Sequence, residues 1–147
     1  MNLHNSLLHR MKILIIDDEP SNVALLEYLL RENGYSRFQS VTDARTALET
    51  FATFQPDLIL LDLMMPHIDG FTILEAIRSG HETEAFLPVV VLTADVNEET
   101  KRRALAVGAT DFLCKPFDHA EVCLRIRNLL ENRRLHLAVE RDCNSCC

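Results

Sequence analysis

The feature that most constrains the fold of this chain is an apolar run, Leu58 to Leu61, that ends in a single carboxylate, Asp62. The run shows no alternation of apolar and polar residues, which is typical of a strand buried on both faces of a parallel sheet. Asp62 would then lie at the carboxyl end of that strand, the edge where open α/β sheets bind ligands. Taken alone, Asp62 could equally begin a turn, because Pro66 and the pair Asp69-Gly70 follow it.

Strand and helix patterns alternate along the chain. Five such alternations predict a parallel sheet with helices on both faces and right-handed crossovers. The predicted strands are 12–16, 38–41, 58–62, 88–93 and 111–114, and the predicted helices begin at Pro20, Thr42 or Asp43, Phe71, Glu98 and Asp118. The second helix is expected to bury Ala44, Ala47, Leu48 and Phe51, and the fourth, 98–107, has only a weak apolar stripe.

The chain length and the patterns together predict three parts. A length of 147 residues suits one domain with a sizeable core. Residues 1–10 have no clear period and predict a loose leader, and residues 11–131 predict the folded domain. Residues 132–147 predict a helical extension or the start of a linker.

Composition excludes some classes of function. The net charge of −7 argues against direct nucleic-acid binding, which depends on Lys and Arg. The chain has neither a signal peptide nor an apolar run near the ~20 residues of a membrane span, so we expect a cytoplasmic protein without membrane contact. The five cysteines are expected to be reduced thiols. A metal or redox role for Cys143, Cys146 and Cys147 lacks a second ligand pair at a suitable spacing.

Three other predicted strands also end in chemically active side chains. Asp17-Asp18 follow the first strand, Thr93 closes the fourth and Lys115 follows the fifth. Because parallel strands end at one edge, these groups are expected to share a site with Asp62. Clustered carboxylates repel one another unless a cation holds them, and an oxygen-only ligand set suits Mg²⁺. The sequence therefore predicts a Mg²⁺-assisted phosphoryl site.

In this order and at these strand ends, the motifs resemble the receiver domain of two-component response regulators, over roughly Met11 to Leu130. The motifs are Asp17-Asp18, Asp62 with the following Met-Met-Pro and Asp-Gly, Thr93-Ala94, and Lys115-Pro116-Phe117. The resemblance implies a doubly wound, flavodoxin- or CheY-like fold with five helices and five parallel strands in the order 2-1-3-4-5.

The resemblance also implies a role for each residue of the site. Asp62 would take a phosphoryl group from a phosphohistidine on a histidine kinase or a His-phosphotransfer protein. Lys115 and the Thr93 hydroxyl would contact the phosphoryl oxygens, and Pro116 would follow a cis peptide bond that aims Lys115. Asp18 and Asp62 would bind Mg²⁺ directly, Asp17 largely through water, and the backbone carbonyl of Met64 would complete the protein ligands.

A phosphoryl group would act by pulling Thr93 and its loop inward. In the family this movement lets an aromatic residue of the last strand turn inward; here that residue is Phe112, which could also be a plain core residue. The expected output surface comprises helix 98–107, strand 111–114 and the last helix. Upon phosphorylation, acidic and basic side chains on this surface could join two copies of the chain, or they could simply be solvated helix faces. The acidic residues are Asp95, Glu98 and Glu99, and the basic residues are Arg125, Arg127, Arg133 and Arg134.

The resemblance implies a signalling domain whose own chemistry is limited to self-phosphorylation and slow dephosphorylation, and three alternatives compete with it. A phosphatase of the haloacid dehalogenase type needs an acid two residues after its nucleophile, where this chain has Met64. A flavin-binding protein needs a glycine- or hydroxyl-rich loop where this chain has Asp17, Asp18 and Glu19. The sequence is also compatible with a receiver that serves as an unphosphorylated docking scaffold.

Met64 bears on the lifetime of the phosphorylated state. Because its apolar side chain cannot orient an attacking water, we expect it to slow hydrolysis of the phosphoryl group.

Overall fold

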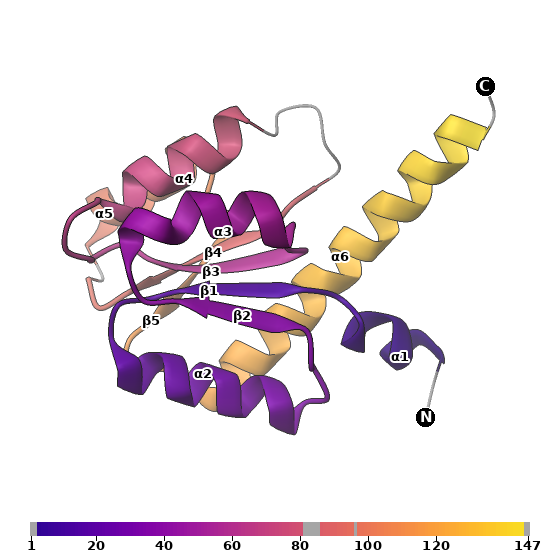
Figure 1. Cartoon of the computed structure of the whole chain (residues 1–147), viewed down its shortest axis with the longest axis horizontal. Coiled ribbons are helices and arrows are strands. Elements are labelled where there is room, and N and C mark those ends of the chain that lie inside the picture. The colour runs from indigo at the N-terminus through magenta and orange to yellow at the C-terminus, as the bar shows by residue number, and fades with distance from the viewer. Residues whose placement is uncertain (1–2, 81–85, 96, 146–147) are drawn as a thin grey trace.

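The computed structural model describes residues 3–80, 86–95 and 97–145, and it contains one parallel sheet (Figure 1). The strands lie in the order β2-β1-β3-β4-β5, and all neighbouring pairs are parallel. This confirms the predicted doubly wound order. The strands are β1 (Ile13–Ile16), β2 (Phe38–Val41), β3 (Leu58–Asp62), β4 (Val89–Thr93) and β5 (Asp111–Cys114).

Helices cover both faces of the sheet (Figure 1). Among the described residues there are six α-helices and one short 3₁₀ turn, where the sequence predicted five helices. They are α1 (Leu3–His9), α2 (Pro20–Glu32), the turn η1 (Ala44–Thr46), α3 (Ala47–Phe54), α4 (Gly70–Ser79), α5 (Glu98–Val107) and α6 (His119–Ser145). Within the part of the chain that is described, none of these helices is long and apolar enough to cross a membrane.

The core has two halves because successive strand residues point to opposite faces of the sheet. Ile13 and Ile15 of β1 pack with α2 and α6 on one face, whereas Leu14 and Ile16 pack with α3 and α4 on the other. Both halves are closed, since every residue of β3 and β4 is buried. The continuous apolar runs of the sequence therefore correspond to central strands covered on both sides.

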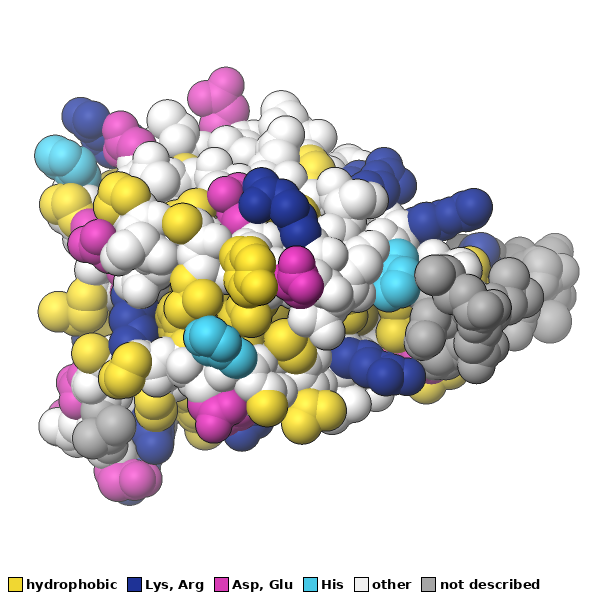
Figure 2. Space-filling view, turned by 90° about the horizontal axis from the view of Figure 1, so that it is seen from below, with side chains coloured by type: hydrophobic (Ala, Val, Ile, Leu, Met, Phe, Trp, Pro, Cys, Tyr) yellow, Lys and Arg dark blue, Asp and Glu magenta, His cyan; other side chains and the backbone are white. Residues whose placement is uncertain are grey.

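The α2 side of the molecule exposes apolar side chains between charged ones (Figure 2). α2 starts with Pro20 in its first turn, buries Val23, Leu26, Leu29 and Leu30, and leaves Tyr28 55% exposed. Its apolar face therefore lies on the sheet, with one large aromatic ring outside.

Two local predictions were wrong. The supposed leader forms α1, whose Leu8 is 2% exposed and belongs to the core. Leu48 is 39% exposed rather than buried. Asp43 caps the 3₁₀ turn η1 through the N–H of Arg45, and α3 begins only after that turn. Because a 3₁₀ turn has a different residue period from an α-helix, the face predicted from a single continuous helix was wrong at Leu48.

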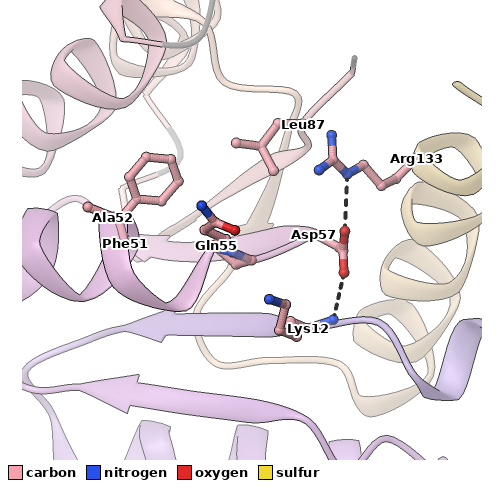
Figure 3. A pocket seen from close by; sticks show the side chains of 8 residues that line it. Lys12, Phe51, Ala52, Gln55, Asp57, Leu87 and Arg133 are labelled. Atoms are coloured by element: carbon pink, nitrogen blue, oxygen red, sulfur yellow. Dashed lines mark hydrogen bonds and ion pairs between the residues drawn. The ribbon is translucent and has the colours of Figure 1, made fainter. Parts of the chain in front are cut away.

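The amino ends of the strands carry a small charged cluster (Figure 3). Asp57, just before β3, accepts hydrogen bonds from the backbone N–H of Lys12 through Oδ2 and from Arg133 Nε of α6 through Oδ1. The Lys12 ammonium donates to the carbonyl of Phe54 at the end of α3. A cleft of about 450 Å³ opens beside this cluster, between α3 and α6.

The last helix continues past the receiver-like region. Asp118 caps it through the N–H of Glu121, at the predicted start of the helix, and Val122, Ile126 and Leu129 are buried. α6 then runs on beyond the edge of the sheet to Ser145 (Figure 1). The side chains of Cys143, Cys146 and Cys147 lie outside the described part, as do residues 81–85 between α4 and β4.

Candidate functional site

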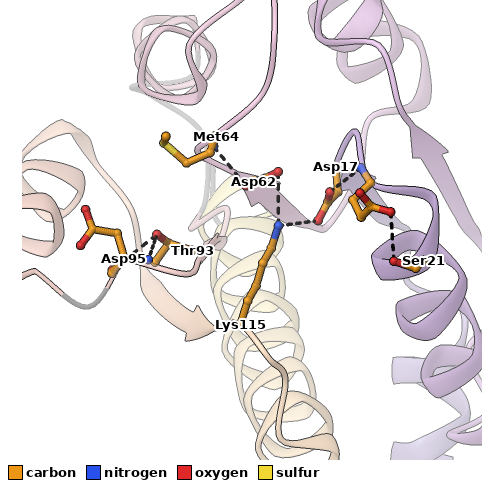
Figure 4. Close-up of polar contacts among 8 residues, drawn as sticks. Asp17, Ser21, Asp62, Met64, Thr93, Asp95 and Lys115 are labelled. Atoms are coloured by element: carbon orange, nitrogen blue, oxygen red, sulfur yellow. Dashed lines mark hydrogen bonds and ion pairs between the residues drawn. The ribbon is translucent and has the colours of Figure 1, made fainter.

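Three carboxylates meet at the carboxyl edge of the sheet, and Figure 4 shows two of them, Asp17 and Asp62. Asp17 follows β1 directly and Asp62 ends β3, and these two strands are neighbours. Asp17, Asp18 and Asp62 each offer an oxygen that lies within 4.8 Å of the others. Asp17 is 0% and Asp62 2% exposed, so two of the three carboxylates are removed from water.

One lysine reaches two of these carboxylates. Lys115 Nζ lies 3.2 Å from Asp17 Oδ2 and 3.3 Å from Asp62 Oδ2 (Figure 4). Lys115 follows β5, and its peptide bond to Pro116 is cis, as the resemblance implied. Two buried carboxylates thus share a single ammonium group, with Asp18 close by, which leaves an excess of negative charge at the site.

The pKa of Asp62 reflects its burial and, to a smaller degree, this negative charge. Burial raises the pKa of Asp62 to about 6, and the neighbouring Asp17 carboxylate acts in the same direction. The hydrogen bond from the Met64 N–H to Asp62 Oδ1 and the charge of Lys115 lower the pKa and only partly offset the rise. The site therefore holds a carboxylate that is costly to ionise without a further cation.

The donor set fits a hard divalent cation. Asp17 Oδ2 is buried and accepts no hydrogen bond from any described residue, so its contact with Lys115 is one of charge alone. Asp17 Oδ1 is already held by the N–H of Glu19. An oriented carboxylate with an unused oxygen, beside two further carboxylates, matches the oxygen-only coordination that Mg²⁺ prefers.

The loop after Asp62 depends on a glycine. A Cβ on Gly70 would lie 2.6 Å from both the Asp62 carbonyl oxygen and Leu63 Cα. Asp69 caps α4 by accepting the N–H of Phe71, so α4 begins directly beneath the end of β3. The sequence suggested only a turn at Asp69-Gly70; the close approach that requires glycine became visible in the structure.

Thr93 closes β4 and is 1% exposed. Its hydroxyl oxygen accepts the N–H of Asp95, and the Asp95 carboxylate accepts hydrogen bonds from the N–H of Asn97 and the hydroxyl of Thr100. Thr100 lies in the first turn of α5. The threonine at the site is therefore linked by side-chain hydrogen bonds to a helix of the expected output surface, a link that the sequence analysis missed.

The structure brings most of the predicted site residues to one edge. Lys115 and the three carboxylates are in contact or within a few ångströms, and Thr93 and Met64 line a neighbouring cleft of about 670 Å³ together with Asp95 and Arg103. Met64 is 75% exposed. Phe112 of β5 is half-buried and packs against the core half that contains α3 and α4.

The basic side of the expected output surface differs from the prediction. Arg133 points toward the sheet and pairs with Asp57. Arg125 pairs with Asp111 and Glu121, and Arg134 pairs with Glu131. Arg125, Arg133 and Arg134 therefore each have an acidic partner within the chain.

Comparison with known proteins agrees with this geometry. The model of the response regulator receiver domain family matches residues 13–127. The alkaline phosphatase synthesis transcriptional regulatory protein PhoP of Bacillus subtilis is 37% identical over 84% of this chain and 50% of its own length. The transcriptional regulatory protein PcoR of Escherichia coli is 41% identical over 86% of this chain and 54% of its own length. The chain thus spans about half the length of these curated relatives.

A solved structure adds a metal to the comparison. The receiver domain of the sensor histidine kinase PA1611 from Pseudomonas aeruginosa superposes with a TM-score of 0.73 at 30% identity, over 83% of this chain and 98% of that one. A magnesium ion is coordinated in its active-site cleft.

Proposed function

The chain belongs to the response regulator receiver domain family, and from this premise we propose that Asp62 accepts a phosphoryl group from a phosphohistidine on a partner protein. The observation that carries the proposal is the cluster of Asp17, Asp18 and Asp62, two of them buried, with Lys115 paired to Asp17 and Asp62. Phosphoryl transfer needs charge neutralisation and positioning more than covalent help, and this site offers both.

The reaction follows from the positions of the groups. A carboxylate oxygen of Asp62 attacks phosphorus, the P–N bond of the phosphohistidine breaks, and an acyl phosphate forms while the imidazole leaves. The Met64 N–H orients Asp62 through Oδ1, and Lys115 Nζ is close enough to pair with an oxygen of the new phosphoryl group. Mg²⁺, held by Asp17, Asp18, Asp62 and the Met64 carbonyl, would supply positive charge to the phosphoryl oxygens.

The signal would leave the site through Thr93. Its oxygen accepts the Asp95 N–H, and its hydroxyl donates a long hydrogen bond of 3.5 Å to the Asp95 carbonyl, which can be exchanged for one to a phosphoryl oxygen on Asp62. Because Asp95 is bonded to Thr100, a shift of Thr93 pulls on the first turn of α5. Phe112, half-buried beside this region, would follow by repacking, and the surface of α5, β5 and α6 would change.

Two surfaces suit partners in this scheme. A histidine kinase or His-phosphotransfer protein must reach Asp62, and exposed Met64 offers it apolar contact near that edge. On the α5–β5–α6 surface, Leu105 is 52% and Leu124 61% exposed, which favours a phosphorylation-dependent dimer through apolar contact. The internal pairs of Arg125 and Arg134 make a dimer held by those arginines less favourable.

The test is intact mass after incubation with Mg²⁺ and acetyl phosphate. We expect one added phosphoryl group in the wild type and none in Asp62→Asn or without Mg²⁺. Asp57→Asn, which changes an aspartate at the opposite edge, is the matched control and should still be phosphorylated. Phosphorylation of Asp62→Asn to the wild-type extent would refute the proposal.

A scaffold that works without phosphorylation is the second candidate. It would show no added mass with acetyl phosphate or with a phosphorylated histidine kinase, yet would bind its partner equally well as wild type and as Asp62→Asn.

A further inference from the structure

Two segments outside the family match pack against each other at the amino edge of the sheet. The match covers residues 13–127, so α1 precedes it and the last part of α6 follows it. α1 contacts α6, and Figure 1 shows the two helices side by side beyond the end of the strands. We propose that α1 and Arg133 together form a brace that fixes the direction of α6 beyond Leu130 relative to the sheet.

The first contact of the brace is apolar. Leu8 of α1 is 2% exposed and belongs to the same core half as Leu129 and Leu130 of α6. Leu137, two turns further along α6, packs against that same cluster. Since an isolated helix of seven residues is unstable in water, α1 is helical because of this packing.

The second contact fits α1 to the turn after α2. The His9 ring lies edge-on to the Tyr35 ring, with centroids 5.5 Å apart and planes at 90°. A Cβ on Gly34 would lie 2.7 Å from atoms of the His9 ring, and Gly34 has φ +90°. The position of α1 therefore depends on glycine at residue 34, because any side chain there would collide with the His9 ring.

The third contact is polar and lies on the same face of α6, because Arg133 is four residues from both Leu129 and Leu137. Arg133, 12% exposed in its side chain, pairs with Asp57 at 3.3 Å and donates to the carbonyl of Phe86. One turn later, the His136 ring lies 5.2 Å from the Phe86 ring. Asp57 is in turn bound to the backbone of Lys12 between α1 and β1, so both parts of the brace meet at the start of the first strand.

These contacts keep the part of α6 beyond Leu130 in line with the part that packs on the sheet. Apolar and polar contacts along one face, from Leu129 through Arg133 to Leu137, prevent the helix from pivoting at Leu130. The α6 part of the proposed output surface and the extension would then move together with the sheet. This inference does not depend on phosphorylation of Asp62.

The experiment is amide hydrogen exchange of the full chain, followed in peptides that cover residues 131–141 and in peptides that cover β3. Leu8→Ser removes the apolar contact, and Leu7→Ser, at a 42% exposed neighbour, is its control. Arg133→Ala removes the polar contact, and Arg134→Ala, whose partner Glu131 lies on the same helix, is its control. We expect exchange in 131–141 to rise at least tenfold in Leu8→Ser and in Arg133→Ala, with each control within twofold of wild type and β3 unchanged.

Two results would overturn the brace. Exchange in 131–141 that is equal in Leu8→Ser and Leu7→Ser would show that α6 keeps its direction without α1. Exchange that rises in β3 as much as in 131–141 would show that Leu8 stabilises the whole domain instead of the extension. Acetyl phosphate labelling of the same variants tests phosphorylation of Asp62 separately. Failure of the brace proposal can therefore be distinguished from failure of the phosphorylation proposal.

Discussion

At the amino edge of the sheet, Asp57 receives a donor on each oxygen, from Lys12 N–H and from Arg133. At the carboxyl edge, Asp62 shares one lysine with Asp17, and an oxygen of Asp17 lacks a hydrogen bond from any described group. Both edges use the same residue types, aspartate with a basic partner. The difference teaches that the first cluster serves stability, whereas the second lowers stability and keeps ligand positions available.

The largest effect is expected at the amino edge. Asp57→Ala should lower the free energy of unfolding by about 3 kcal/mol, because it leaves a largely buried guanidinium and a backbone N–H without their acceptor. Urea denaturation measures this change, with Glu49→Ala on the exposed side of α3 as the control. A loss no greater than in that control would mean that the Asp57 cluster is not a source of stability.

The carboxyl edge should respond with the opposite sign. Without Mg²⁺, Asp62→Asn should raise the free energy of unfolding at pH 7.5 by about 2 kcal/mol, since it removes a buried carboxylate that must ionise. The folded-state pKa of Asp62 is about 6, above the roughly 3.9 of an unfolded aspartate. Wild-type stability should therefore fall as pH rises from about 4 to about 6, and the advantage of Asp62→Asn should disappear near pH 4. A variant less stable than wild type at pH 7.5 would contradict this assignment.

The sequence predicted the carboxyl edge better than the amino edge for a physical reason. Parallel strands end at one edge by topology, so Asp17, Asp62, Thr93 and Lys115 could be placed together from strand ends alone. The pairing of Asp57 with Arg133 joins residues 76 positions apart through the phase of a long helix. That phase places Arg133 toward the sheet, although its charge suggested an outer surface.

α1 and Leu48 show the same limit at a smaller scale. A helix of seven residues has too few turns to display a period, and α1 depends on contact with α6, far along the chain. Leu48 was misplaced because η1 changes the helical phase just before it. The local sequence pattern was therefore enough to predict most helices and strands, whereas contacts between the two ends of the chain could be seen only in the structure.

Magnesium should sharpen the contrast between the edges. At a concentration tenfold above its Kd, Mg²⁺ should raise the free energy of unfolding of the wild type by about 1.4 kcal/mol through binding to the folded state alone. Asp57→Ala should keep this increment, and Asp17→Asn should lose most of it. Thermal unfolding with and without Mg²⁺, followed by chelation with EDTA, measures the change. An equal increment in Asp17→Asn and wild type would place the metal elsewhere.

The smallest effect concerns two residues with left-handed backbone, one at each edge. Gln55, with φ 53°, ends α3 at the amino edge, and His67, with φ 77°, lies in the loop after Asp62. The left-handed conformation costs a residue with a Cβ about 1 kcal/mol of stability. Glycine avoids this cost, but its more flexible unfolded state offsets part of the gain. Gln55→Gly should therefore raise the free energy of unfolding by about 0.5 kcal/mol and leave acetyl phosphate labelling unchanged. His67→Gly should give a similar gain, but it loosens the loop that orients Met64 and Gly70 around the acceptor, so its labelling rate should change. If both variants change the labelling rate equally, or neither changes it, the backbone conformation at the carboxyl edge is no more important for phosphorylation than the backbone conformation at the amino edge.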